Sequence, residues 1–296
     1  APSATARAPS LADYALLLAL AVIWGASFTL IKVGVETVPA ASLTAGRLVV
    51  AAVVMIAVAL HYRQRLRLAK APWGLIALAA LTGNALPFLL IAWGEEGIDS
   101  GLAAILMGVM PLAAMALAHV LTPDDRLTRG KIVGCLLGLA GLVVLIGPDK
   151  LSRLGDDVVR QLAIALAAVS YGLNANLTRS LTGGPPHATV AVVMVASLVM
   201  ALPVALVANA PLMLEPSLAS VAAVIALGVF QTGLGTVMMF ELIRRRGASF
   251  FAQINFLVPV SGVLWGALFL GERPGPAALV ALALILLGVG IARVWR

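Results

Sequence analysis

The strongest constraint on the fold is a run of twenty residues, Leu102–Leu121, whose only ionisable side chain is His119. About twenty apolar residues in a helix, rising ~1.5 Å each, cross the ~30 Å hydrocarbon core of a bilayer. A shorter, glycine-rich apolar run, Ile132–Gly147, follows after a charged turn. These two runs predict a pair of membrane-spanning helices joined by a short polar connection.

The same order of landmarks returns near the C-terminus, in Ser249–Trp295. In each copy a proline lies inside the first run, an acid–arginine pair follows, and a glycine lies fifteen residues after the arginine. The matched positions are Pro111 and Pro259, Asp125-Arg126 and Glu272-Arg273, and Gly141 and Gly288. The offset is 148 residues at the prolines and 147 after them. We therefore predict two homologous halves, residues 1–147 and 148–296.

Composition favours a membrane protein over a soluble one. Hydrophobic residues make up 61% of the chain and charged residues 11%, against about 25% charge in soluble domains. The basic residues behind the net charge of +7 are scattered between apolar runs, which argues against nucleic acid as a partner. The single cysteine excludes an internal disulfide. A P-loop, a Cys/His metal spacing and a nucleophile elbow are absent, so we expect no cofactor, no metal and no enzymatic activity.

The apolar runs predict an all-α membrane protein with ten transmembrane helices. The loops on the side of the N-terminus hold fourteen Lys and Arg residues and the other side holds four, so we expect both termini to be cytoplasmic. The first run is expected to be retained as a span, not cleaved as a signal. The predicted spans are Leu11–Val33, Ala40–Tyr62, Pro72–Trp93, Gly101–Leu121, Lys131–Gly147, Val158–Arg179, His187–Ala208, Ser217–Ile243, Ser249–Leu270 and Pro276–Val294.

Five spans per half is an odd number, so the second half must enter the membrane upside down relative to the first. Inverted repeats related by an axis in the membrane plane are a transporter architecture, with the site near the bilayer midplane where the halves meet. Residue spacing alone thus predicts a transporter.

Three short segments carry a family resemblance. They are Trp24-Gly25-Ala26-Ser27-Phe28-Thr29-Leu30-Ile31-Lys32 in the first span, Pro39 after it, and Ala45-Gly46-Arg47 in the second. With the repeated proline, acid–arginine and glycine landmarks, they resemble the drug/metabolite transporter superfamily, in its ten-helix bacterial exporter branch, and are most similar to aromatic amino-acid exporters. The resemblance implies a basket of spans 1–4 and 6–9 around a central cavity, with spans 5 and 10 packed at one side, in the bacterial inner membrane. The second half departs from the motif, with Ser170-Tyr171-Gly172 and Arg179 in the matching places.

Amides inside spans are candidate substrate ligands, because an intramembrane polar group is costly and usually faces protein or a cavity. They fall in spans 3, 6, 8 and 9 and avoid spans 5 and 10, as expected for a cavity built from the first four spans of each half. The alternative is hydrogen bonding between helices, worth only ~0.6–2 kcal/mol per pair. The candidates are Asn84, Asn174, Asn176, Gln231, Gln253 and Asn255.

Further candidates are a cation and three apolar or aromatic side chains. Lys32 could attract a substrate carboxylate; alternatively it pairs with Glu36 or a lipid phosphate. Trp24 and Tyr171 occupy related repeat positions and could stack on a substrate, and Met107 could line an adaptable wall. Ordinary helix packing is the alternative for all three. A structural role is expected for Arg47.

Helix-disrupting residues at matching repeat positions are candidate hinges. Proline removes a helical hydrogen bond and clashes with the preceding turn. Pro111 and Pro259 occupy matching points, and Pro87 falls opposite Gly235 at the same offset of 148. We expect spans 3, 4, 8 and 9 to flex at these points; tolerated kinks are the alternative.

The expected function is export of amino acids, aromatic or apolar, and related metabolites by alternating access. The sequence places Glu95 and Glu96 at the outer mouth and shows no other prominent carboxylate within a span, which favours facilitated uniport over tight proton coupling. The same fold could instead move a drug, purine, sugar or cationic dye, and a passive channel or a membrane enzyme are alternatives of another class. The expected assembly is a monomer or weak homodimer.

Overall fold

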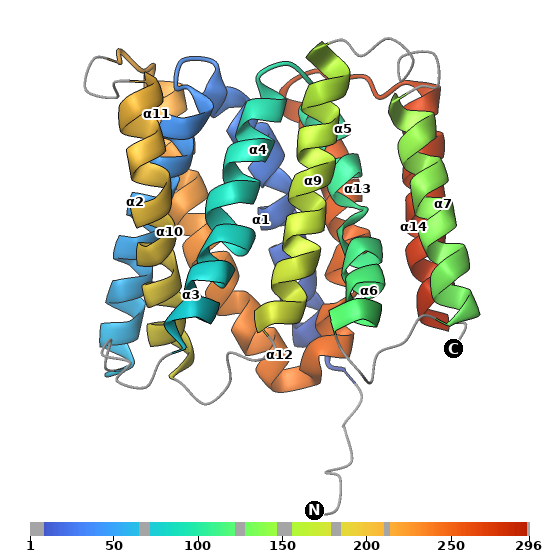
Figure 1. Cartoon of the computed structure of the whole chain (residues 1–296), viewed down its shortest axis with the longest axis horizontal. Coiled ribbons are helices and arrows are strands. Elements are labelled where there is room, and N and C mark those ends of the chain that lie inside the picture. The colour runs from blue at the N-terminus through green and yellow to red at the C-terminus, as the bar shows by residue number, and fades with distance from the viewer. Residues whose placement is uncertain are drawn as a thin grey trace, which may run out of the picture.

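The computed structural model describes residues 9–64, 72–121, 128–146, 156–178, 185–209 and 214–294. Every regular element in these ranges is a helix, and the helices run up and down between two faces, with α1 beginning and α14 ending at the same face (Figure 1). The elements are α1 (Leu11–Val35), α2 (Ala40–His61), α3 (Trp73–Ala80), η1 (Leu81–Ala85), α4 (Leu86–Glu95), α5 (Ser100–Met107), α6 (Met110–Leu121), α7 (Arg129–Ile146), α9 (Asp156–Leu177), α10 (Pro186–Asn209), α11 (Leu218–Ala226), η4 (Leu227–Leu234), α12 (Gly235–Phe251), α13 (Ile254–Phe269) and α14 (Pro276–Val294).

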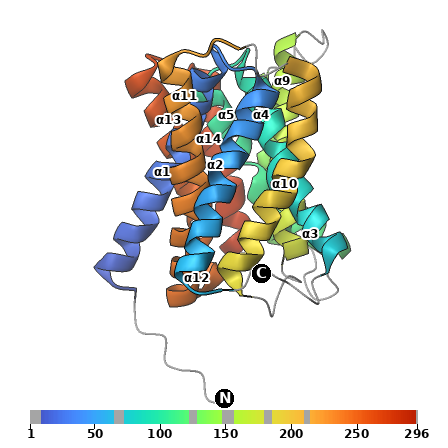
Figure 2. The same ribbon diagram turned by 90° about the vertical axis from the view of Figure 1, so that its left-hand side faces the viewer.

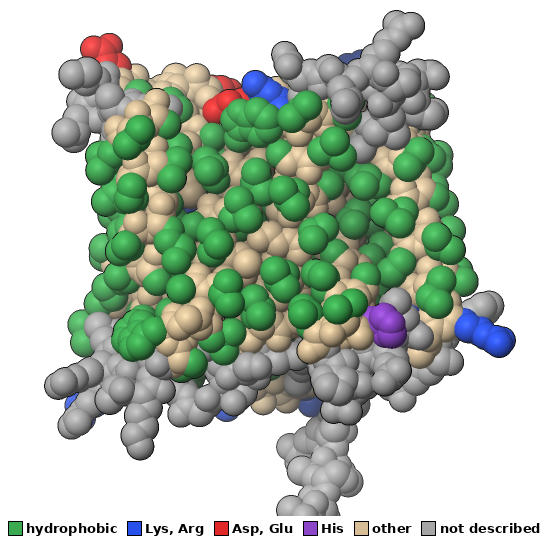
Figure 3. Space-filling view, viewed as in Figure 1, with side chains coloured by type: hydrophobic (Ala, Val, Ile, Leu, Met, Phe, Trp, Pro, Cys, Tyr) green, Lys and Arg blue, Asp and Glu red, His purple; other side chains and the backbone are tan. Residues whose placement is uncertain are grey.

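The surface of this bundle suits a bilayer. Hydrophobic side chains cover the middle of the face seen in Figure 3, while the charged side chains gather toward its upper and lower edges. Within the described ranges, seven helices are long and apolar enough to cross a membrane, and Ile254–Phe269 and Pro276–Ala292 are shorter apolar helices. The chain is therefore an all-helical membrane protein.

The start of α1 shows how the sequence sets a helix boundary. Ser10 and Asp13 form a reciprocal capping box, in which the Asp13 carboxylate accepts from the Ser10 backbone N–H at 2.9 Å. Arg246 of α12 donates to the same carboxylate at 2.5 Å. The start of the first helix is thus capped locally and linked to α12 by the Arg246 side chain.

The connection predicted after Ile243 is wrong, because α12 continues as a helix to Phe251. Glu241 accepts from Arg244 and Arg245, three and four residues later, at 2.6 Å each. Pairs at this spacing lie on one helical face and stabilise the helix. The basic cluster therefore forms the last turns of α12.

Predicted spans 3 and 8 both contain a π-helical segment, η1 and η4. A π-turn widens the helix and releases carbonyls from regular hydrogen bonding. The Thr82 carbonyl of η1 accepts from Ser170 Oγ at 2.9 Å, and the Gln231 carbonyl of η4 accepts from Trp24 Nε1 at 3.0 Å. Each irregular segment is therefore anchored to a helix from the other half of the chain.

Spans 4 and 9 are both interrupted, but the breaks lie at different distances from the two prolines. The first break lies between Met107 and Met110, so Pro111 is the second residue of the new helix α6. Pro259 lies inside α13, which is separated from α12 by Ala252–Gln253. A Cβ on Gly108 would lie 3.4 Å from Pro259 Cγ, so the first break is packed against the second proline.

Two long helix pairs complete the bundle. α7 and α14 pack on each other at one side, as expected for spans 5 and 10 (Figure 1), and α2 packs along α10 (Figure 2). At Gly134 of α7 and Gly288 of α14, a Cβ would lie 2.5 Å and 2.6 Å from the other glycine's carbonyl oxygen. Glycine is used here for close helix approach.

Candidate functional site

A group of charged side chains, two of them buried and two half-buried, surrounds the end of α4. It consists of Lys32 from α1, Arg47 from α2, Glu95 from α4 and Glu272 from the α13–α14 connection, which we call the α4 charge cluster. Lys32, Glu272 and Arg47 all lie close enough to Glu95 to interact with it electrostatically. Charged side chains inside a membrane protein are rare and mark functional sites by default.

Lys32 caps the end of α4. Its Nζ donates to the backbone carbonyl of Glu95 at 2.7 Å and to that of Ile98 at 2.8 Å. The last carbonyls of a helix have no partner within the helix, and a lysine there satisfies them. Lys32 therefore bonds to backbone carbonyls, not to Glu36 as the alternative interpretation held.

Arg47 is almost completely buried, with an exposed fraction of 7%. Its Nε donates to Thr232 Oγ1 of η4 at 2.9 Å, and its guanidinium lies over the Phe88 ring, 3.7 Å from the centroid. This is the geometry of a cation–π contact, which is stronger where water is excluded. The expected structural role of Arg47 is compatible with these contacts.

Glu95 was expected at the outer mouth, and the structure shows that its side chain is enclosed there. Glu95 is the last residue of α4, and its exposed fraction is 0%. Neither carboxylate oxygen has a hydrogen-bond partner in the described part of the chain. Gly94 lets α9 pack over this point, since a Cβ there would lie 3.1 Å from the Arg160 carbonyl oxygen. The burial removes the reason for favouring uniport.

Glu272 satisfies the start of α5. Its two carboxylate oxygens accept from the backbone N–H groups of Ser100 at 2.7 Å and Gly101 at 2.8 Å. The N-cap residue Asp99 makes no such bond with its own side chain. A carboxylate at a helix N-terminus is stabilised by the unpaired N–H groups and the helix dipole. The acid–arginine turn of the second half thus supplies an acid that joins the two halves, while Asp125-Arg126 of the first half lies outside the described residues.

The predicted amides do not converge on one point. Asn84 of η1 donates to Ser197 Oγ of α10 at 3.1 Å, and Asn174 of α9 accepts from Thr82 Oγ1 at 3.4 Å. These two residues therefore bond on two sides of η1 and hold helices together.

The remaining predicted amides lie elsewhere. Gln231 donates weakly to the Ile23 carbonyl at 3.4 Å, while its own carbonyl accepts from Trp24, so this pair joins η4 to α1. Gln253 precedes α13 without capping it, and Asn255 donates to the Ala252 carbonyl of its own turn at 3.1 Å. Asn176 donates to the Ala114 carbonyl of α6 at 3.0 Å.

Tyr171 and Met107 have apolar surroundings. Met107, at the end of α5, packs against a buried cluster that includes Phe28 and Leu106. Tyr171 packs against this cluster and against a second one that contains Phe88, and it lies close enough to Arg47 to interact electrostatically. Of these two predicted residues, only Tyr171 adjoins the α4 charge cluster.

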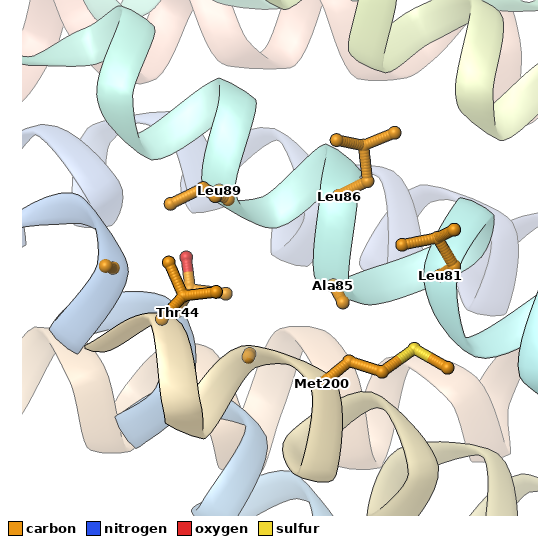
Figure 4. Close-up of a pocket in the computed structure, with 9 residues that line it drawn as sticks. Thr44, Leu81, Ala85, Leu86, Leu89 and Met200 are labelled. Carbon is orange, nitrogen blue, oxygen red and sulfur yellow. The ribbon is translucent and has the colours of Figure 1, made fainter. Parts of the chain in front are cut away.

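An apolar cavity of about 110 Å³ lies between α2, α4 and α10 (Figure 4). Met200 of α10 approaches it from one side, and Leu81, Leu86 and Leu89 from the other. A second cavity of about 80 Å³ lies beside Glu272 at the α13–α14 connection. None of the predicted substrate-binding residues lines either cavity.

The sequence contained a weak signal for the missed residue. Glu95 follows Phe88 by seven residues, so both lie on one face of α4, the face that also receives Arg47. Residue spacing cannot show which helix covers that face. In the described part of the chain, the structure groups no three His, Cys, Asp or Glu residues as metal ligands.

Replacing Lys32 with methionine is expected to lower the free energy of unfolding by about 1–3 kcal/mol, because the Glu95 and Ile98 carbonyls lose their buried donor. Thermal unfolding of the purified variant in detergent measures this loss. Glu36→Gln, at the exposed C-cap position that follows α1, is the control and should unfold like wild type. Wild-type stability of Lys32→Met would contradict the capping role.

A helical bundle with an apolar belt and a charge cluster drawn from both halves of the chain is typical of a membrane transporter. The chain belongs to the EamA-like transporter family, which matches residues 12–147 and again residues 160–294. The family is one of transporters, not enzymes, and lies within the drug/metabolite transporter superfamily that the sequence resembles.

Relatives cover nearly the whole chain. A probable terminal-alkyne amino-acid exporter of Streptantibioticus cattleyicolor is 31% identical over 95% of this chain and 92% of its own length. An S-adenosylmethionine/S-adenosylhomocysteine transporter of Chlamydia trachomatis is 27% identical over 92% of this chain and 86% of its own length. An uncharacterized inner membrane transporter, YedA, of Escherichia coli is 25% identical over 93% of this chain and 89% of its own length. A crystal structure with a TM-score of 0.67 and 22% identity covers 95% of this chain and 97% of its own, which shows a shared fold.

Proposed function

We propose that this protein exports amino acids, aromatic or apolar, and related small metabolites across the bacterial inner membrane by alternating access between two inverted five-helix halves, 1–147 and 148–296. The observation that carries the proposal is that the transporter family matches each half separately. The proposed topology has ten transmembrane spans and places both termini in the cytoplasm. Consistent with this topology, α2 ends and α9 begins at opposite faces (Figure 1).

Contacts between the halves support the inverted arrangement. Helix α1 packs on η4 and α13, and helix α9 packs on η1 and α6. Gly25 in α1 and Gly172 in α9 each allow close approach at one of these crossings, and they lie 147 residues apart, the offset of the sequence repeat. The first helix of each half thus packs against helices of the other half. An interface built this way can rearrange on either side of the membrane.

The substrate class rests on shared chemistry. One relative is named for an amino acid, and the other for S-adenosylmethionine, which also ends in an ammonium and a carboxylate group. The α4 charge cluster offers two cations and two carboxylates at one place. Groups of both signs suit a zwitterionic ligand, because each end of the ligand finds an opposite charge.

Proteoliposomes test the substrate directly. Purified protein should exchange labelled phenylalanine, leucine or an alkyne-bearing amino acid with saturable kinetics and counterflow. S-adenosylmethionine, a purine, a sugar and a cationic dye serve as competitors, which separates amino-acid export from transport of another cargo. A channel would conduct without saturation or counterflow, and absence of flux for every amino acid would refute the substrate class. Gel filtration in detergent distinguishes the expected monomer from a weak homodimer.

The hinge proposal concerns four residues. Pro87 and Gly235 lie beside the π-helical segments, Pro111 lies beside the break of span 4, and Pro259 lies inside α13. Pro111→Ala and Pro259→Ala are expected to slow transport more than they lower stability, because each restores a helical N–H and stiffens the segment. Initial rates in proteoliposomes and thermal unfolding measure the two effects. Wild-type flux from both variants would exclude a hinge role, and a fall in stability that fully explains the flux would make these positions structural.

A further inference from the structure

Glu95 is chemically different from the other members of the α4 charge cluster. Lys32 is bonded to two backbone carbonyls, Arg47 to Thr232 and the Phe88 ring, and Glu272 to two backbone N–H groups. Glu95 alone in this cluster has no hydrogen bond to its carboxylate within the described ranges, and it is fully buried. Its charge is therefore the least stabilised of the four.

The surroundings of Glu95 come from four elements. Lys32 faces it from α1, Arg47 from α2 and Glu272 from the α13–α14 connection. On α9, Arg160 lies beside Gly97 and over the Trp93 ring, 5.6 Å from the centroid, and Tyr171 interacts with Arg47. Neither Lys32 nor Arg47 donates a hydrogen bond to the Glu95 carboxylate, so both cations act on it through space.

A buried carboxylate without hydrogen bonds has few stable states. An ionised group in a low-dielectric interior is costly unless it is paired and hydrogen-bonded, and a carboxyl can relieve that cost by taking up a proton. The neighbouring carboxylate Glu272 adds like-charge repulsion, while the two cations offset part of it. A proton needs no cavity, so it can occupy the closed site as the structure presents it.

We propose that Glu95 is a proton-binding site and that transport exchanges one proton for one substrate molecule. The proton passes from water on one side to a carboxylate oxygen of Glu95 and is released to water on the other side. The ammonium group of an amino acid is the other cation that can neutralise the same carboxylate. Proton and substrate therefore compete for Glu95, and competition for one alternating site produces antiport.

The first experiment needs no substrate and so is independent of the proposed function. Purified protein in nanodiscs is titrated with acid and followed by infrared difference spectroscopy. The expected result is a protonated-carboxyl band in wild type that disappears as the pH rises, is missing in Glu95→Gln and remains in Glu36→Gln. A wild-type spectrum unchanged by Glu95→Gln overturns the proton site. Gel filtration confirms folding, and Glu95→Asp, which keeps a carboxyl group, should retain a titrating band if Glu95→Gln does not fold.

The second experiment measures coupling and rests on the proposed amino-acid function. With a gradient of about one pH unit and the membrane potential clamped at zero, wild type should accumulate labelled phenylalanine or leucine about tenfold in the acid compartment, because one unit is a tenfold ratio of proton concentrations. Glu95→Gln should equilibrate to a ratio of one, and Glu36→Gln should behave like wild type. Flux without accumulation in wild type, or accumulation that survives in Glu95→Gln, overturns antiport. A titrating Glu95 band without amino-acid flux would refute the substrate class and leave the proton site standing.

Discussion

Gly172→Leu is expected to force α9 away from α6, abolish transport and lower the free energy of unfolding by about 3 kcal/mol, at the upper end of typical overpacking costs. A Cβ on Gly172 would lie 2.8 Å from the Ala114 backbone nitrogen and 3.1 Å from the Ala113 carbonyl carbon. These are backbone atoms, which cannot rotate aside as a side chain can. Thermal unfolding in detergent and flux in proteoliposomes measure the two effects.

The repeat supplies a second variant for the same prediction. At Gly25 a Cβ would lie 2.9 Å from the Gly262 backbone nitrogen, so Gly25→Leu should separate α1 from α13 and cause a similar loss. Gly74→Leu is the matched control, because nothing lies within 4 Å of a Cβ at that helical glycine, and leucine is the better helix former. If Gly25→Leu or Gly172→Leu were as stable as wild type, the close helix contact at that glycine would not be required.

Arg47→Met is expected to lower the free energy of unfolding by about 3–5 kcal/mol and to eliminate transport, because it removes a buried cation close to the buried Glu95 carboxylate. Methionine can fill the space but cannot donate to Thr232 Oγ1 or face Phe88 as a cation. Glu95 would then keep Lys32 as its single nearby cation of the cluster.

Two further variants separate charge from geometry at Arg47. Arg47→Lys keeps the charge but loses the planar guanidinium over the Phe88 ring, so it should recover only part of the stability. Adding Glu95→Gln to Arg47→Met should restore part of the lost stability, since the neutral amide no longer requires a nearby cation. Strictly additive effects in this double-mutant cycle would show that Arg47 and Glu95 do not interact.

The helical ranges and irregular points could be predicted where a local signal existed. Long apolar runs indicated the helices, and the candidate hinge residues Pro87 and Gly235 fell just after the two π-helical segments. The boundary after Ile243 could not be predicted in this way, since ion pairs of Glu241 extend α12 through a basic stretch that otherwise resembles a loop.

The candidate site was predicted less well than the fold. Trp24 and Gln231 do meet, but through the Gln231 backbone carbonyl, while Gln253 and Asn255 lie at the α12–α13 junction. The sequence marked polar residues inside apolar runs without indicating which ones face each other. Helix rotation and the choice of neighbour decide that, and both depend on contacts between residues far apart in the chain.

By itself the sequence determined that this protein is a membrane-embedded helical transporter with a repeated order of landmarks, because hydrophobic length and spacing are properties of the linear chain. Only the tertiary structure decided that Glu95 is enclosed, that Lys32 caps α4 and that Arg47 lies over Phe88. The physical reason is that the burial of a charge depends on the helices packed around it. Here α1, α2 and α9 converge on the end of α4 from distant parts of the chain.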